Sequence, residues 1–485
     1  MVAAPGRGAG ELRRTLGFFD AAALHVGTIL GSGIFVAPAA VAAAVTGPVS
    51  AAAFWLLGGL IAACGASCYA ECGARLPRAG GFYVYYRAVY GPALAFVGGW
   101  VALLVTYPAS TAAIALVFGA YLGEVVPALE GHAAACAAAA VIASAAVNIV
   151  GVGLAAGVQR ALSGTKLLAL ALLCLAAVAA GGAVLATGVT GVAGDRGAAS
   201  GAPVAGTPAS DAATTVPGPA TAAPLAGGLL GPAMIAALMV MLFTYDGWSD
   251  IGLIAGEVRD ATRVLGPAVL AATAAIVLVY ATVQWSVLAL LPQGQAALSE
   301  RVVAEAVVAG LGPGAGRLVA LLVAVCAFGS VHSIILGASR IGYAMARDDA
   351  FFEWFGAVAP RLGTPARSIG ALAAATLVYV IAAGFRNLLS LFTFSVWIFY
   401  ALTAVALVIL RRRGTGGPEA WRAPGGLVAP AVVLLTAVLM TTGLMRHDPR
   451  RALIGLSLLL SGLPAFWIWK RIRAGGSGAA RAEGA

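Results

Sequence analysis

Two interruptions in otherwise apolar stretches contain the residues best suited to bind a charged ligand. The first lies at residues 27–35 and has two glycines flanking a serine, and the second lies at residues 243–249 and has an aspartate followed by a glycine. Glycine is the poorest helix former after proline, so both helices are expected to unwind there. Unwound backbone at membrane depth must line a protected cavity, because lipid offers it no hydrogen-bond partner. Paired interruptions in two halves of a membrane chain therefore indicate a ligand site.

The two interruptions suit groups of opposite charge. At the first, the amides of Gly31 and Gly33 and the Ser32 hydroxyl are hydrogen-bond donors. The half-helix that follows directs its positive end at the same place, which suits a carboxylate. At the second, the carbonyls of residues 243–245 suit an ammonium group. Together they would recognise the groups that all free amino acids share, and the alternative is close helix packing through small residues.

Lys166 is a further candidate for chemistry. It is one of only two lysines among 29 Lys and Arg residues, yet it falls inside an apolar stretch. An ionisable group at such a position is costly and is a functional hypothesis by default. An ammonium group releases a proton more readily than a guanidinium, so Lys166 fits a role in ion or proton coupling. The alternative is that its head snorkels to the inner headgroups.

The other candidates have weaker signals. Glu71 and Asp246 could relay protons or contact a substrate amine, and Asp246 is equally suited to cap a half-helix. His25 and His332 are expected to pack or form hydrogen bonds rather than relay protons. Three cysteines share one helix face, but without a nearby His or fourth Cys they indicate helix packing. No P-loop or nucleophile–base motif is present, so we expect no metal, no cofactor and no enzyme.

Membrane-spanning helices are the elements that must position these residues. Of 485 residues, 61% are hydrophobic and 10% are charged, and apolar stretches long enough to cross a bilayer recur along the chain. Twelve spans are predicted, at approximately 18–45, 49–73, 88–118, 133–150, 158–183, 228–255, 264–291, 318–345, 368–385, 387–410, 427–445 and 452–470. The interruptions fall in spans 1 and 6, which predicts two inverted five-helix repeats followed by two helices.

The basic residues set the orientation. Most of the Lys and Arg fall on one side of the predicted spans, so the net charge of +10 indicates cytoplasmic termini rather than nucleic-acid binding. We predict one permease-like domain with flanking segments: a cytoplasmic segment 1–17, spans 1–5 at 18–183, an external loop 191–227, spans 6–10 at 228–410, spans 11 and 12 at 427–470, and a cytoplasmic tail 471–485.

Seven motifs occur in order along residues 14–471. They are 31–36 (GSGIFV), 68–71 (CYAE), 75–81 (RLPRAGG), 245–248 (YDGW) with 257–258 (EV), 339–348 (SRIGYAMARD), 394–400 (FSVWIFY) and 421–424 (WRAP). In these motifs the chain resembles the amino acid–polyamine–organocation superfamily, and within it the bacterial relatives of the L-type amino acid transporters. The resemblance implies a LeuT-type fold with twelve helices and alternating access for an amino acid held between spans 1 and 6.

The resemblance also implies roles for individual residues. Those it places at the substrate are Thr28, Ile29, Ser32, Gly33, Phe243 as the gating aromatic, Thr244, Tyr245, Asp246 and Gly247. It implies that Lys166 takes the place of a sodium ion beside spans 1 and 8, with Ser330 near that position. The loop at 119–132 lacks the cysteine that joins animal relatives to a heavy chain, so we expect a single-subunit monomer or homo-oligomer.

These features predict a secondary transporter of the bacterial inner membrane that moves neutral amino acids. The expected mechanism is sodium-independent proton symport or antiport. One alternative is a carrier of cationic amino acids or polyamines, for which Asp246 would supply the attracting charge. Another is a sensor that binds amino acids without transporting them.

Overall fold

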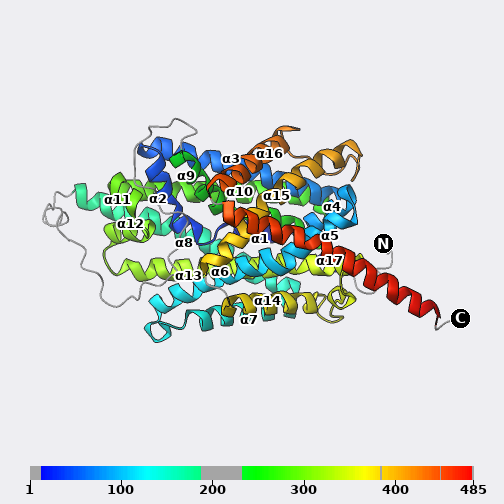
Figure 1. Ribbon diagram of the computed structural model, residues 1–485. Helices are drawn as coiled ribbons and strands as arrows, with labels where there is room; N and C mark the ends of the chain where they lie inside the picture. The colour runs from blue at the N-terminus through cyan, green and yellow to red at the C-terminus, as the bar shows by residue number, and fades with distance from the viewer. Residues whose placement is uncertain (1–11, 187–231, 383–384, 448, 483–485) are drawn as a thin grey trace, which may run out of the picture.

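The computed structural model describes residues 12–186, 232–382, 385–447 and 449–482, which form helices and connecting turns (Figure 1). Within these ranges there is no β-strand, and an isolated backbone bridge joins Leu16 to Val258. Seven of the described helices are long and apolar enough to cross a membrane, and four shorter apolar helices accompany them. The prediction of an all-α polytopic membrane protein is confirmed, while the count of twelve spans stays a prediction.

The first half of the chain contains the first interruption. Its helices are α1 (Phe18–Ile29), η1 (Gly33–Phe35), α2 (Ala37–Ala44), α3 (Gly47–Arg75), α4 (Phe82–Tyr90), α5 (Pro92–Val101), η2 (Ala102–Thr106), α6 (Tyr107–Val125), η3 (Pro127–Leu129), α7 (Ala133–Val150) and α8 (Val152–Ala186). The third predicted span starts later than expected, because Gly91 at a φ of 90° and Pro92 separate α4 from α5. The π-helical turn η2 then joins α5 to α6 as one continuous run.

The second half contains the second interruption. Its helices are α9 (Pro232–Thr244), η5 (Trp248–Ile254), α10 (Ala261–Leu290), α11 (Gln293–Leu298), α12 (Val302–Leu311), α13 (Ala315–Arg347), η6 (Glu353–Gly356), α14 (Ala366–Ala382), α15 (Phe385–Arg412), α16 (Val428–His447) and α17 (Pro449–Ala482). Sequence analysis did not predict α11 and α12, and α17 continues beyond the expected end at residue 470. The loop predicted at 191–227 lies outside the described residues.

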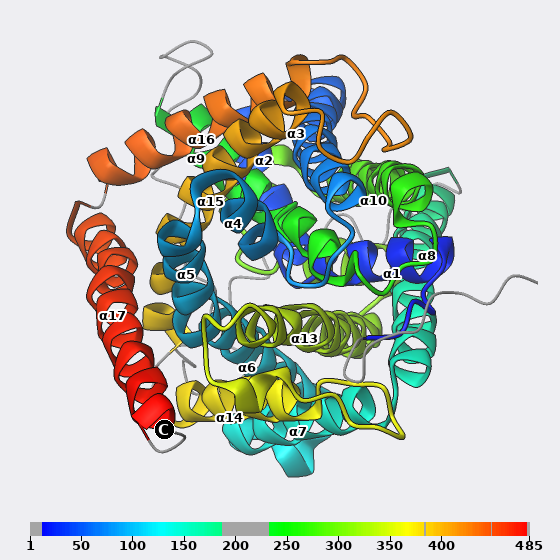
Figure 2. The ribbon, with the colours of Figure 1, turned by 90° about the vertical axis from the view of Figure 1, so that its right-hand side faces the viewer.

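Helices of the two halves pack against one another in matching pairs. Figure 2 shows α1 and α13 in the interior of the bundle, with α17 on its periphery. Helix α3 packs on α10, α6 on α13, and α7 on α14. These pairs join spans 2 and 7, 3 and 8, and 4 and 9, which are counterparts in the two predicted repeats. Such pairing is expected around a pseudo-twofold axis and supports the inverted-repeat prediction.

Candidate functional site

At the first interruption, two backbone amides have no partner among the described residues. Helix α1 ends at Ile29, and the chain resumes a helical turn only at Gly33. The Gly31 amide, which we expected to bind a ligand, donates instead to the Ile29 carbonyl over 2.9 Å. The amides of Ser32 and Gly33 have no acceptor within the described part of the chain. The donors available to an anion are therefore these two amides and the Ser32 hydroxyl.

At the second interruption, one backbone carbonyl has no donor within the described ranges. Helix α9 ends at Thr244, and its last carbonyl accepts a hydrogen bond from the Tyr280 hydroxyl over 3.1 Å. The Phe243 carbonyl accepts from the Asp246 amide over 3.1 Å. The Tyr245 carbonyl has no donor among the described residues. Of the three carbonyls expected to hold an ammonium group, the Tyr245 carbonyl is therefore the one that can still accept a hydrogen bond from a ligand.

The two interruptions touch each other at glycines. A Cβ on Gly33 would lie 3.2 Å from the Cα of Thr244. A Cβ on Gly247 would lie 2.9 Å from the carbonyl carbon of Thr28, and the Thr28 hydroxyl lies 3.2 Å from the Gly247 carbonyl oxygen. Residues 28 and 247 come from different halves of the chain. Because a Cβ at Gly33 or Gly247 would crowd the backbone of the opposite segment, the lack of a side chain at both glycines allows the two unwound segments to meet.

Replacing Gly247 with alanine is expected to disturb this contact. Gly247 has a φ of 110°, where a side chain is strained, and the added Cβ meets the Thr28 backbone. We expect a loss of about 1–3 kcal/mol in stability and of most transport activity. Thermal unfolding and uptake by the purified protein would measure both effects. The control is Gly164→Ala, where a Cβ meets nothing within 4 Å; equal behaviour of the two variants would contradict the contact.

Tyr280 joins the two interruptions through a single hydroxyl. Its oxygen lies 3.2 Å from the Ile29 carbonyl oxygen and 3.1 Å from that of Thr244, so it links the last residues of α1 and α9. Tyr280 is fully buried in α10 and packs against Trp55 and Tyr245. Sequence analysis did not single out this residue; the available signal was one tyrosine in the middle of an apolar span.

A cavity lies between the interruptions and α6, α13 and α15. The volume open to the centres of water molecules is about 130 Å³, roughly ten times the ~10–15 Å³ that one water needs. The predicted site residues that line it are Thr28, Ile29, Gly31, Ser32, Gly33, Phe243, Thr244, Asp246, Gly247 and Ser330. Tyr245 is the exception, because its buried hydroxyl donates to the Trp55 carbonyl over 3.1 Å. None of the lining residues within the described ranges is Lys, Arg or His.

Two aspartates line the cavity, each accepting a hydrogen bond from a tyrosine. Asp246 accepts from the hydroxyl of Tyr400 on α15. Asp250, in η5, accepts from the hydroxyl of Tyr107 on α6 over 2.8 Å. Sequence analysis did not identify Asp250; a second aspartate four residues after Asp246 was the signal that could have found it.

Lys166 points into the protein. Its side chain is fully buried in α8, and its Nζ donates to the carbonyls of Gly27 over 3.3 Å and Leu30 over 3.0 Å. The same Nζ lies 3.3 Å from the hydroxyl oxygen of Ser330 on α13, which itself donates to the Gly27 carbonyl over 2.9 Å. This geometry contradicts snorkelling, because the ammonium group holds the end of α1 instead of reaching a headgroup.

Comparison with known proteins identifies the family. Residues 16–454 match the amino acid permease family, a match that extends over nearly all of the chain. The chain belongs to this family. Its members are membrane transporters rather than enzymes, and this permease is a multi-pass membrane protein that transports amino acids.

Relatives match the permease along most of their length. A serine/threonine exchanger, SteT, of Bacillus subtilis is 25% identical, with 96% of this chain and 98% of the relative covered. A human cystine/glutamate transporter is 25% identical, with 96% and 87% covered. An uncharacterized transporter of Mycobacterium tuberculosis is 30% identical, with 82% and 81% covered.

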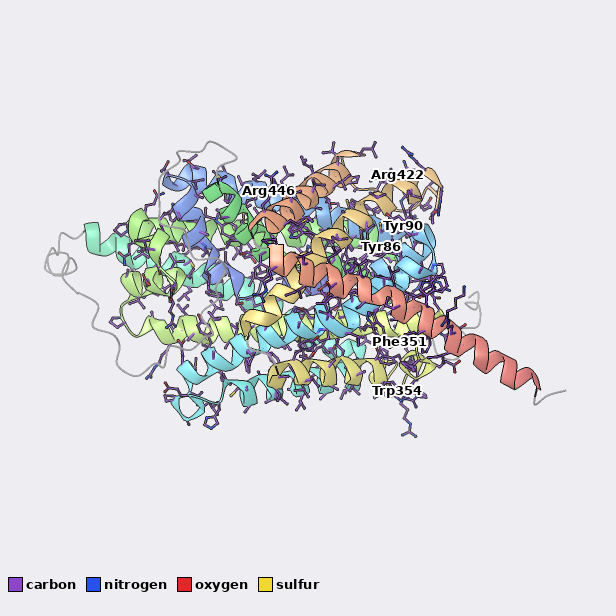
Figure 3. The ribbon with its side chains drawn as sticks, viewed as in Figure 1. Tyr86, Tyr90, Phe351, Trp354, Arg422 and Arg446 are labelled. Atoms are coloured by element: carbon purple, nitrogen blue, oxygen red, sulfur yellow. The ribbon has the colours of Figure 1, made fainter. Side chains whose placement is uncertain are left out.

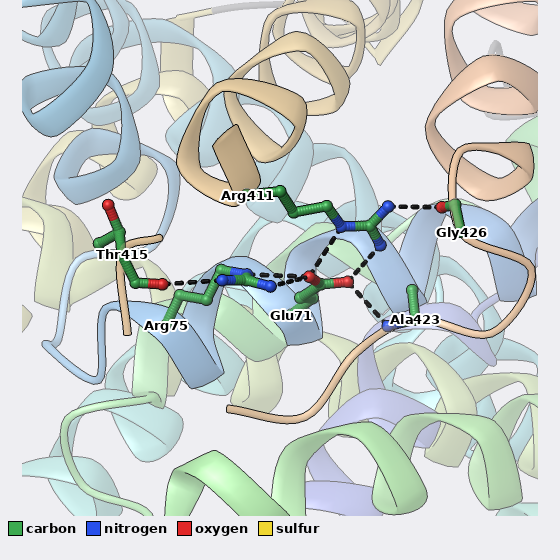
Figure 4. A network of polar contacts seen from close by, with 6 residues as sticks. All are labelled: Glu71, Arg75, Arg411, Thr415, Ala423 and Gly426. Atoms are coloured by element: carbon green, nitrogen blue, oxygen red, sulfur yellow. Dashed lines mark hydrogen bonds and ion pairs between the residues drawn. The ribbon is translucent and has the colours of Figure 1, made fainter. Parts of the chain in front are cut away.

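Glu71 of the permease is bound in an ion-pair network away from the cavity (Figure 4). Both of its oxygens pair with Arg411, and Oε1 lies 2.7 Å from the Arg75 guanidinium. The Ala423 amide donates to Oε2 over 2.7 Å. The carboxylate therefore joins α3 to α15 and to the segment before α16. It does not contact the cavity, where a role in substrate or proton binding would place it.

Replacing Glu71 with glutamine is expected to destabilise the permease. Two guanidinium groups would lose their shared counter-charge at a buried position, and such losses cost about 3–5 kcal/mol. Thermal unfolding of the purified protein would measure the effect. Glu419→Gln is the matched control, since Glu419 pairs with Arg263 at an exposed position and exposed pairs contribute little. Equal melting temperatures for the two variants would contradict the structural role of the network.

A buried ion pair and two tyrosine hydrogen bonds join further helices of the permease. Arg340 and Glu257 form a fully buried pair with two hydrogen bonds, of 2.7 and 3.1 Å, between α13 and the segment after η5. Figure 3 shows Tyr86 and Tyr90 of α4, whose hydroxyls donate to α15 carbonyls over 2.6 and 2.7 Å. These contacts join α4 to α15 and α13 to the segment after η5.

The two buried histidines have local hydrogen-bond partners. His25 lies 2.9 Å from the hydroxyl of Thr273. His332 lies 3.2 Å from the Asn148 amide nitrogen and 3.0 Å from the Ala155 carbonyl. Neither histidine lines the cavity, so both agree with the packed, hydrogen-bonded roles that the sequence favoured.

Proposed function

We propose that this amino acid permease is a secondary transporter that holds an α-amino acid between its two helix interruptions. The substrate carboxylate would accept hydrogen bonds from the Ser32 and Gly33 amides, and its ammonium group would donate to the Tyr245 carbonyl. The observation that carries this proposal is that both interruptions line one cavity, beside which the Ser32 and Gly33 amides have no acceptor and the Tyr245 carbonyl, between the lining residues Thr244 and Asp246, has no donor among the described residues. Helix ends of this kind suit the two charged groups of a free amino acid.

We also propose that transport is independent of sodium, by proton symport or antiport. The oxygens around the Lys166 ammonium group, from Gly27, Leu30 and Ser330, are of the kind that coordinates sodium at unwound helices. A fixed positive charge among them supports a mechanism in which no sodium ion enters. The name of the exchanger from Bacillus subtilis favours antiport.

The proposed setting is the bacterial inner membrane with both termini in the cytoplasm. The positive-inside pattern supports this orientation. A single-subunit carrier, as a monomer or homo-oligomer, is proposed because residues 119–132 contain no cysteine for a heavy-chain disulfide.

Uptake into proteoliposomes tests the proposal. A panel of labelled amino acids would be offered without sodium, with an imposed pH gradient or with unlabelled amino acid inside. Acceleration by internal amino acid would indicate antiport, and acceleration by an inward proton gradient would indicate symport. A strict requirement for sodium would overturn the role of Lys166. Binding without uptake or exchange would overturn transport and favour the sensor alternative.

The class of substrate depends on the rest of the cavity. The sequence favoured neutral amino acids, whereas the two aspartates of the cavity, Asp246 and Asp250, favour the cationic alternative. The helix interruptions would recognise only the groups that all amino acids share. Selectivity between neutral and cationic amino acids must therefore arise where the substrate side chain lies.

A further inference from the structure

Asp250 presents an unused hydrogen-bond acceptor at the cavity. Its side chain is almost fully buried, with a relative exposure of 4%, and Asp250 lines the cavity. Oδ1 accepts from the hydroxyl of Tyr107 over 2.8 Å and from that of Ser249 over 3.1 Å. Oδ2 has no partner within the described part of the chain. A carboxylate accepts about four hydrogen bonds, so a ligand in the cavity can still bind this oxygen.

Among the described residues, Asp250 has no positively charged partner. Both donors to it are neutral hydroxyl groups, and the lining residues that the structure describes include no Lys, Arg or His. Lys166 donates to backbone carbonyls of α1 and to Ser330, and Arg340 pairs with Glu257. A buried carboxylate is costly unless it is paired with a positive charge. The cavity is therefore complementary to a cation that arrives with the substrate.

Asp250 is not one of the groups proposed to hold the substrate's α-carboxylate and α-ammonium, so it is available to another part of the substrate. It belongs to the helical turn η5, beyond Gly247, and it faces α6 through Tyr107. An amino acid held by the two interruptions would reach Asp250 with its side chain. A terminal ammonium or guanidinium group there would bind Oδ2 through charge-assisted hydrogen bonds.

We propose that Asp250 is a specificity-determining residue that selects amino acids with a second positive charge at the end of the side chain. The proposal rests on the function proposed above and names the substrate class of the same site. The substrates would be basic α-amino acids, since the helix interruptions require the α-carboxylate that polyamines lack. Asp246, already bonded to Tyr400, would add to the negative charge of the cavity.

Arginine and citrulline provide the direct test, because they have nearly the same shape and differ in the charge of the terminal group. We expect wild-type proteoliposomes to take up labelled arginine at least about tenfold more efficiently than labelled citrulline, as expected for a buried charge pair. Asp250→Asn should reduce this ratio to near one while uptake of citrulline continues. Asp250→Glu, which keeps the charge, should preserve the preference for arginine.

A matched control and a stability measurement separate specificity from folding. Glu130→Gln removes an acidic group at an exposed position outside the cavity and should leave the ratio unchanged. Melting temperatures of all variants would show that they are folded, and the wild-type ratio decides the question if Asp250→Asn does not fold.

Equal wild-type uptake of arginine and citrulline would overturn this inference and leave the proposed function standing. If a proton gradient drives citrulline uptake and Asp250→Asn abolishes that uptake, Asp250 would be a proton-coupling residue. That result would also overturn the inference. Absence of uptake of any amino acid would overturn the proposed function instead.

Discussion

Lys166→Met is expected to lower amino acid uptake at least about tenfold at neutral pH and to change its dependence on pH. Methionine fills a similar volume but donates no hydrogen bond, so the Leu30 carbonyl at the end of α1 would lose its partner. Leaving a buried polar group unsatisfied costs about 1–3 kcal/mol. The end of α1 would also lose the positive charge that complements its helix dipole.

The chain provides a close control for this experiment in Lys470→Met. Lys470 is the only other lysine, and it lies exposed near the ring of Trp467 on α17. Both variants remove one ammonium group, but only Lys166→Met removes one that holds the first interruption. Wild-type uptake rates and an unchanged pH profile for Lys166→Met would contradict a role in coupling and show that the lysine serves only in packing. Uptake that became sodium-dependent would support the replacement of a sodium ion by the ammonium group.

Gly33→Val is expected to abolish most transport by separating the two interruptions. A Cβ at this position would lie 3.1 to 3.4 Å from the Oγ1, Cα and Cβ of Thr244, and valine adds two further methyl groups. Since α9 ends at Thr244, displacement there moves the backbone proposed to hold the substrate's ammonium group. We expect uptake to fall at least about tenfold, which corresponds to ~1.4 kcal/mol or more of lost substrate binding.

The effect of Gly33→Val must be distinguished from a general loss of folding. Gly164→Val makes the same change on α8, where a Cβ meets no atom within 4 Å, and should retain both uptake and melting temperature. Binding of labelled substrate to detergent-purified protein would separate loss of binding from loss of movement. Substrate affinity at the wild-type level in Gly33→Val would contradict the arrangement of the two interruptions.

Local sequence features predicted the positions of the interruptions well. Glycine has low helix propensity wherever it lies, so the breaks between α1 and η1 and between α9 and η5 follow from local composition. The inward position of Lys166 was also predicted, because an ammonium group within an apolar span is costly unless it finds polar partners inside the protein. These features depend on residues that are close together in the chain.

Features that depend on distant contacts were not predicted. The link from Tyr280 to both interruptions requires the positions of α1, α9 and α10 relative to one another. The burial of Tyr245 against Trp55 likewise depends on the rotation of α9. Asp250 was missed because the role proposed for it depends on a cavity lined by several helices, whose described residues include no Lys, Arg or His. The short helices α11 and α12 were missed because they are not apolar runs of membrane-spanning length.

Competition by substrate analogues tests whether the interruptions bind the α-carboxylate and the α-ammonium of one substrate. The best substrate of the uptake panel would compete with its own labelled form, beside its decarboxylated and its deaminated analogues. Because each analogue lacks one charged partner of an interruption, both should compete at least about tenfold more weakly than the parent amino acid. If either analogue competed as well as the parent, the interruption assigned to the missing group would not be binding it, and the account would be contradicted.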